Sequence, residues 1–292
     1  MDNIVTRYNR GSKELVFLNE HKSIEELREE ELNEHMWRRY LRRRPLLPEV
    51  KLTISKLQHV TTKTGVKGII RNGFKGEYYA IGNCNYGPFS YWSGVVDPEE
   101  VETEISDWIE ENTELDPSDM NANSPAFSEE SLYGNYKFSL DFEDVLNAYE
   151  YRFCGGENAV FRVFGMSCFK QQIVYTVVVH SPYEDQFCDF PLLPNDPDNS
   201  ICGLEDDTIF WWPESVSSFN EYNDDESIDW RKYFVWDHLV FAFHVEHYFQ
   251  FTKVFLLKHL TPCQLYEVNI CMEKETRRTA KKFIKWLKYC NR

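Results

Sequence analysis

The alternation of apolar and polar residues between positions 51 and 74 predicts a strand followed by a short helix. Apolar and polar residues alternate along Lys51–Gln58, as they do in a half-buried strand. A helical spacing follows, carried by Val66, Ile69 and Ile70. Thr61 or Thr62 could cap that helix, and Gly73 could end it in the left-handed conformation. We therefore expect His59 at the end of a strand, beside the N-terminus of a helix.

A capping box predicts another helix near the start of the chain. Ser23 is followed three residues later by Glu26, so each side chain can accept a hydrogen bond from the other residue's backbone N–H. This helix should run to about Leu41, beyond which Pro45 and Pro48 prevent its continuation.

The remainder of the chain mixes strand and helix patterns. Glu77–Val96 predicts strands that are broken at Gly82 and at Gly87-Pro88. Further strands are expected at Tyr136–Leu140, Ala159–Phe164, Ile173–His180, Thr208–Trp212 and Phe234–Val245. Helices are expected at Pro98–Asn112, Phe142–Phe153 and about Glu275–Cys290. Loops are expected at Asp116–Glu130 and Pro182–Asn199.

The closing helix has an apolar stripe opposite a row of cations. The stripe consists of Phe283, Ile284 and Leu287, and we expect it to be buried against Phe234–Val245. The row consists of Lys281, Lys285 and Lys288, which should face solvent or acidic loops.

The order of elements predicts an α+β fold in three parts. Residues 1–50 would form an N-terminal helical arm and residues 51–182 the core. Residues 183–292 would form a smaller, aromatic-rich α+β part.

Composition and charge restrict the ligands and the cellular compartment that we expect for this protein. The chain has 292 residues and a formal charge of −16, which disfavours general binding to nucleic acid or to an anionic membrane. The longest apolar run, Ile173–Val179, is too short to span a bilayer, and Met1–Lys13 lacks the apolar core of a signal peptide. Eight cysteines without a CxxC pair are expected to be reduced thiols. We therefore expect a cytoplasmic or nuclear protein that is not secreted.

Positive charge is concentrated at the two ends of the chain. Glu77–Tyr136 and Gln171–Trp230 contain no Lys or Arg, whereas one basic cluster comprises Arg38, Arg39, Arg42, Arg43 and Arg44. Two interpretations remain open. The basic ends could dock on acidic faces of the same molecule, or the arginine cluster could form a local patch for RNA phosphates.

Two segments resemble the PARP-like ADP-ribosyltransferases. The first runs from His59-Val60-Thr61 through the predicted helix to Gly73-Phe74, and the second is Gln171–Tyr175, similar to the family's Glu-x-Val-x-Tyr strand. A fainter resemblance is to vertebrate and fish PARP-like proteins linked to interferon responses and innate immunity. The resemblance implies a split antiparallel sheet with flanking helices and NAD as substrate.

The same resemblance assigns roles to single residues. His59 would hold the ribose of NAD, and Thr61 matches the small hydroxyl residue of the family. Val60, whose backbone would grip the nicotinamide amide, stands where the family usually has Gly. Tyr91 would stack on the nicotinamide. Gln172 occupies the position of the family's glutamate.

Gln172 limits the chemistry that this site could perform. Loss of nicotinamide leaves an oxocarbenium-like cation, which a carboxylate stabilises and an uncharged amide does not. We therefore expect a mono-ADP-ribosyltransferase or a weakly active pseudoenzyme, with His59, Tyr91 and Gln172 as its catalytic residues. The alternative is a non-catalytic interaction module with an unknown protein partner and no NAD site.

A metal site finds less support in the sequence. His244-Val245-Glu246 and Pro262-Cys263 resemble half of a zinc-deaminase motif, but Tyr266 stands where the second cysteine should be. We expect no metal cofactor.

Overall fold

The computed structural model describes residues 4–9, 12–23, 26–27, 51–81, 84–111, 130–131, 133–169, 172–195, 201–213, 216–217, 233–234, 237–265 and 281–289. The Arg38–Arg44 cluster, the rest of the predicted N-terminal helix and almost all of the Asp116–Glu130 loop lie outside these residues. The capping box itself is confirmed. The Glu26 amide donates to Ser23 Oγ over 3.1 Å, and the Ser23 amide donates to Glu26 Oε2 over 2.7 Å.

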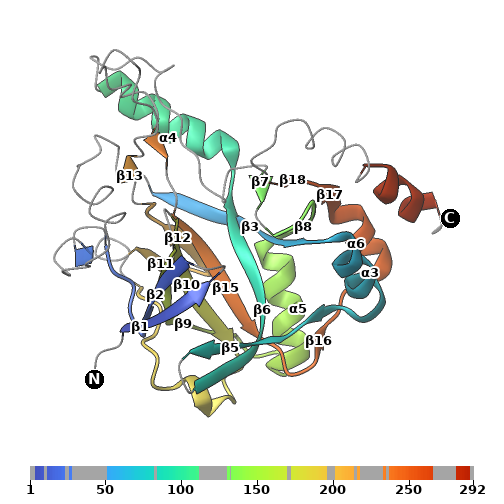
Figure 1. Cartoon of the computed structure of the whole chain (residues 1–292), viewed down its shortest axis with the longest axis horizontal. Helices are drawn as coiled ribbons and strands as arrows, with labels where there is room; N and C mark the ends of the chain where they lie inside the picture. The colour runs from blue at the N-terminus through green and yellow to red at the C-terminus, as the bar shows by residue number, and fades with distance from the viewer. Residues whose placement is uncertain are drawn as a thin grey trace.

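A twelve-stranded, mostly antiparallel sheet dominates the structure (Figure 1). Its strands are β1 (Ile4–Asn9), β2 (Ser12–Leu18), β3 (Leu52–Thr61), β5 (Glu77–Ile81), β6 (Cys84–Val96), β8 (Tyr136–Asp141), β9 (Val160–Phe169), β10 (Gln172–His180), β11 (Cys202–Glu205), β12 (Thr208–Trp211), β15 (Asp237–His244) and β17 (Leu260–Pro262). The main path runs β1-β2-β9-β10-β15-β6-β3-β12-β11, with β5 on β6, β8 on β3 and β17 on β8. The mixed α+β class is therefore confirmed.

Strands from all three predicted parts of the chain pair with one another in this sheet. β15, from the predicted C-terminal part, lies between β10 and β6 of the predicted core, parallel to β10 and antiparallel to β6. β2, from the predicted N-terminal arm, pairs with β9. Backbone hydrogen bonds thus join all three parts into one sheet.

Shorter elements complete the described structure. These are the strands β4 (Phe74–Lys75), β7 (Glu130–Ser131), β13 (Val216–Ser217), β14 (Tyr233–Phe234), β16 (Tyr248–Phe249) and β18 (Gln264–Leu265), the helices α3 (Lys63–Asn72), α4 (Pro98–Glu111), α5 (Phe142–Phe153) and α6 (Lys253–His259), the 3-10 helix η2 (Asp185–Phe187), and a helix at 281–289.

Local signals define the helix that follows β3. Thr62 caps α3 by accepting the Gly65 amide over 3.3 Å, as predicted for Thr61 or Thr62. Gly73 ends the helix with a φ of 96°, and its amide donates to the Ile69 carbonyl over 2.8 Å. A Cβ at Gly73 would lie 2.6 Å from the Phe249 carbonyl oxygen, so the close approach of that segment also requires glycine.

Two strand predictions need correction. β6 is not broken at Gly87-Pro88, because it passes through a cis peptide bond there, with Gly87 at a φ of 108°. Of the strand expected at Phe234–Val245, residues Asp237–His244 form β15, whereas Phe234 belongs to the short strand β14.

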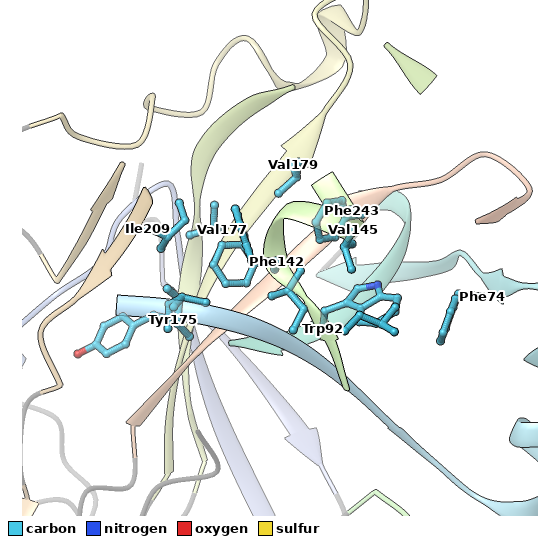
Figure 2. Close-up of a cluster of buried hydrophobic side chains, with 14 of the residues drawn as sticks. Phe74, Trp92, Phe142, Val145, Tyr175, Val177, Val179, Ile209 and Phe243 are labelled. Atoms are coloured by element: carbon cyan, nitrogen blue, oxygen red, sulfur yellow. The ribbon is translucent and has the colours of Figure 1, made fainter. Parts of the chain in front are cut away.

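Buried side chains form two clusters on opposite faces of the sheet. The larger includes Trp92 on β6 and Tyr175 on β10, with Phe142 and Val145 of α5 packed over them (Figure 2). The smaller lies on the other face and consists of Phe89, Phe164, Val178, Phe187, Phe190 and Ala242. Among the described residues, Cys154, Cys168, Cys188, Cys202 and Cys263 are not joined in disulfides, as expected.

The helix at 281–289 is buried through the predicted residues, but against another part of the chain. Phe283 and Ile284 are each 6% exposed, and Leu287 packs on the larger cluster. The ring of Phe283 makes an edge contact with Tyr136 on β8, at 5.4 Å between centroids. The helix therefore covers the end of the sheet at β8, beside α3, whereas α5 packs on β15 through Phe142 on Phe241 and Tyr149 on Phe243.

Candidate functional site

His59, predicted to hold the ribose, is a half-buried side chain packed against the core. Its Nδ1 donates a hydrogen bond to the Tyr91 carbonyl oxygen over 2.8 Å. Its ring centroid lies 5.0 Å from that of Phe74 and 5.5 Å from that of Trp92. Burial lowers the pKa of His59, and the Tyr91 carbonyl and Glu77 only partly oppose this effect. His59 is thus a neutral ring held among aromatic side chains.

The Tyr91 side chain lies on the opposite face of the sheet. Its ring is 6.3 Å from that of Tyr79 and 5.9 Å from that of Phe89, and both neighbours belong to the smaller cluster or pack on it. Trp92, the next residue along β6, belongs to the larger cluster, where it contacts His59. His59 therefore reaches only the backbone of Tyr91, since neighbouring strand residues point to opposite faces.

Gln172 lies far along the sheet from both residues. Ala242 on β15 pairs with Tyr91 on one side and with Val178 on the other. Gln172 precedes Val178 by six residues on β10, which corresponds to about 20 Å along a strand. The three residues therefore do not converge on one cleft, contrary to the sequence-based expectation. Two features separate them: the His59 and Tyr91 side chains point to opposite faces of the sheet, and Gln172 lies six residues along β10 from the row that contains Tyr91.

Val60 and Thr61 also take part in packing. They pair with Lys137 and Tyr136 of β8. A Cβ at Gly65 would collide with Thr61 Oγ1, and a Cβ at Gly134 would collide with the Thr61 carbonyl oxygen. Gly65 and Gly134 of the same chain therefore occupy the space next to Thr61.

Two histidines that the sequence analysis did not connect lie side by side. Val179 on β10 is level with Phe243 on β15, so His180 and His244 end the two parallel strands together. His180 Nδ1 donates to the Ser181 carbonyl oxygen over 2.8 Å, and its Nε2 accepts from Arg162 Nε over 3.0 Å. These partners fix one neutral tautomer, and burial lowers the pKa of His180.

The polar atoms around His244 hold the loop that follows β10. His244 Nδ1 lies 3.8 Å from Glu184 Oε2, and its Nε2 lies 3.3 Å from Gln186 Nε2. Burial lowers the pKa of His244, while Glu184 acts in the opposite direction. Arg162 Nη1 also donates to the Phe190 carbonyl oxygen over 2.8 Å. Because these groups are satisfied by one another, we interpret the cluster as a latch that holds residues 181–190 on the sheet.

An open pocket lies between α3 and the helix at 281–289, which sit at the same end of the molecule (Figure 1). Its volume of about 370 Å³ falls within the range typical of small-ligand sites. Its lining combines three cations with two aromatic rings, namely Lys63, Lys67, Lys282, Phe283 and Trp286. The amino group of Lys63 stands 4.8 Å from the centroid of the Phe283 ring.

The two helices that flank this pocket carry positive charge only. α3 supplies Lys63, Lys67 and Arg71, and residues 281–289 supply Lys281, Lys282, Lys285 and Lys288. All seven are exposed, and neither helix contains Asp or Glu. The chain as a whole has a formal charge of −16, so this surface is a positively charged region on a negatively charged protein.

The sequence analysis missed this pocket although its components were visible. Lys63 and Lys67 are four residues apart, as are Lys281 and Lys285, so each pair lies on one face of a helix. The sequence gives no sign that the two helices meet, because their contact depends on the packing of Phe283 against β8.

No family model, no curated protein and no solved structure matches the chain. None of the described helices is long and apolar enough to cross a membrane. In the part of the chain that the structure describes, no three His, Cys, Asp or Glu side chains gather in a way that could hold a metal ion.

Proposed function

We propose that this protein is a non-catalytic binding module whose ligand site is the pocket between α3 and the helix at 281–289. The alternative, ADP-ribosyl transfer from NAD, needs a ribose-holding group, a stacking ring and a hydrogen-bonding group around one substrate. His59, Tyr91 and Gln172 do not surround a common space, since two of the side chains lie on opposite faces of the sheet and the third residue lies about 20 Å along it. Transfer chemistry therefore stays a prediction from the resemblance.

One observation carries the proposal. Three exposed cations, Lys63, Lys67 and Lys282, line a pocket that also presents Trp286, and the two helices carry four more exposed cations and no carboxylate. A cluster of like charges destabilises a fold through self-repulsion, so its presence favours a role in binding. A ligand of opposite charge would relieve that repulsion. The ligand should therefore be anionic.

Charge reversal on both walls of the pocket tests the proposal. The variant is Lys67→Glu with Lys282→Glu, and the matched control is Lys56→Glu with Arg152→Glu, at two exposed cations of other elements. The probes are inorganic polyphosphate, a ten-residue Asp peptide and a ten-nucleotide single strand, titrated by calorimetry in 50 and 200 mM salt. At least one probe should bind, more weakly at the higher salt. Binding should be lost in the pocket variant and kept in the control.

The proposal fails if no anionic probe binds the wild-type protein, or if both variants bind equally well. NAD provides a separate measurement. A ligand at 100 times its dissociation constant stabilises a protein by about 2.7 kcal/mol, so a substrate site would raise the melting temperature at high NAD concentration. We expect no such rise. A rise that His59→Ala removes would restore the transferase interpretation.

A further inference from the structure

Trp286 is an exposed aromatic ring that packs on the buried ring of Phe283. It is 54% exposed, an unusual state for the largest apolar side chain. Its ring lies within 21° of parallel to that of Phe283, at 6.0 Å between centroids. Phe283 is buried and contacts Tyr136 of the sheet, so Trp286 rests on a rigid support. A supported, exposed ring is suited to stack on a flat ligand group.

Cations line the same pocket as this ring. Lys63 and Lys67 belong to one wall of the pocket, and Lys282 belongs to the wall that carries Trp286. An anion bound at these lysines would be next to the indole ring. A ligand that uses both features must combine negative charge with a planar group.

The same helix continues this pattern along its exposed side. Tyr289 is 78% exposed and follows Trp286 by three residues, so the two rings occupy neighbouring positions on one helical face. Lys285 and Lys288 each precede one of these rings by a single residue. The pattern of ring and cation thus repeats beyond the pocket, as a ligand with repeating units would require.

From these observations, and resting on the proposed function, we propose that the ligand is single-stranded nucleic acid. Its phosphates would contact Lys63, Lys67 and Lys282, and one base would stack on Trp286. Positive grooves with exposed aromatic rings bind single strands in this way, because every base offers a flat face. An acidic peptide would satisfy the lysines but would leave Trp286 and Tyr289 without a partner. A duplex would keep its bases stacked on each other and away from the indole ring.

Anisotropy with labelled ten-nucleotide oligomers tests this inference. The probes are single-stranded RNA, single-stranded DNA, a DNA duplex and a ten-residue Asp peptide. The variants are Trp286→Ala, Trp286→Phe and, as a matched control, Tyr151→Ala, at a tyrosine that is 85% exposed on α5. Losing one stacked base weakens binding about 5- to 150-fold, so we expect that loss in Trp286→Ala. Trp286→Phe should recover most of the affinity, and Tyr151→Ala should bind as the wild type does.

Each outcome decides between the two proposals. Binding of either single strand with the expected loss in Trp286→Ala supports the inference, and the RNA and DNA probes show which sugar is preferred. Binding of the Asp peptide alone would overturn the inference and leave the anionic site standing. Equal binding of duplex and single strand, or an unchanged Trp286→Ala variant, would overturn the stacking role. Failure of every probe would overturn the inference, and failure of inorganic polyphosphate as well would overturn the anionic site.

Discussion

Acid should destabilise this protein through histidines that are buried in the neutral form. Burial lowers the pKa of His21 and of His238 to about 4, against about 6.5 in an unfolded chain. The unfolded state therefore binds these protons first. The stabilisation is complete above pH of about 6.5 and is lost as the pH falls from about 6.5 toward about 4.

The magnitude follows from proton linkage. For one histidine with these two pKa values, the free energy of unfolding should fall by about 1.2 kcal/mol between pH 7 and pH 5.5. Two such histidines give about 2.4 kcal/mol, a large part of the roughly 5–15 kcal/mol that holds an ordinary domain together. Changes in the charge of the many carboxylates act over the same range. A variant that lacks one of these histidines but keeps the carboxylates therefore isolates the contribution of that histidine to the pH dependence of the free energy of unfolding.

Urea unfolding at pH 7 and pH 5.5 measures that difference. His238→Gln removes the titrating ring from a buried position near the start of β15 and keeps a polar side chain there, and His247→Gln is the matched change at an exposed histidine. Between the two pH values the wild type should lose about 1.2 kcal/mol more than His238→Gln does. Parallel losses, within about 0.3 kcal/mol, would show that His238 is not the buried neutral group described above.

Three further predictions concern stability. Phe283→Ala should cost about 3 kcal/mol in urea unfolding, because it empties the contact between the helix at 281–289 and Tyr136; a cost below about 1 kcal/mol would mean that this helix is detachable. Arg162→Met should speed amide exchange and protease cleavage within residues 181–190, since it removes the hydrogen bonds to His180 and to the Phe190 carbonyl; unchanged exchange would refute the latch. Gly165→Ala should destabilise the protein by about 2 kcal/mol or more, because a Cβ at a φ of 150° would collide with the Phe17 carbonyl oxygen. Gly156→Ala is its control, with a positive φ but no neighbour within 4 Å, and equal costs at the two positions would contradict this reasoning.

Local signals were sufficient for much of the fold. α5 was predicted with its observed bounds, because its apolar spacing and the glycines that follow it are properties of one short segment. The cap at Thr62 and the box at Ser23 are equally local, since each pairs groups three residues apart. Where one segment contains both partners of an interaction, its residue pattern is informative.

The predicted site, in contrast, depended on contacts between segments that lie far apart in the sequence. No residue pattern near 172 or 240 shows that β15 separates β10 from β6, because strand pairing joins segments that are far apart in sequence. A register shift between Ile54 and Lys56 also changes which residues of β3 face the larger cluster, so Leu57 is buried although simple alternation would expose it. For these reasons the sequence analysis correctly placed His59 on a strand but wrongly placed the side chains of Tyr91 and Gln172 around it.

The central position of β15 has a consequence for the order of folding. β10 and β6 cannot be joined until residue 244 has been synthesised, although β10 ends at residue 180. Until then each strand presents an unpaired, strongly apolar edge, the feature that promotes association between chains. The pairing also closes a loop of more than fifty residues, which slows the search for the native contact. Newly made chains should therefore expose both edges until β15 pairs with them, and a chain truncated before β15 should aggregate more readily than the whole chain.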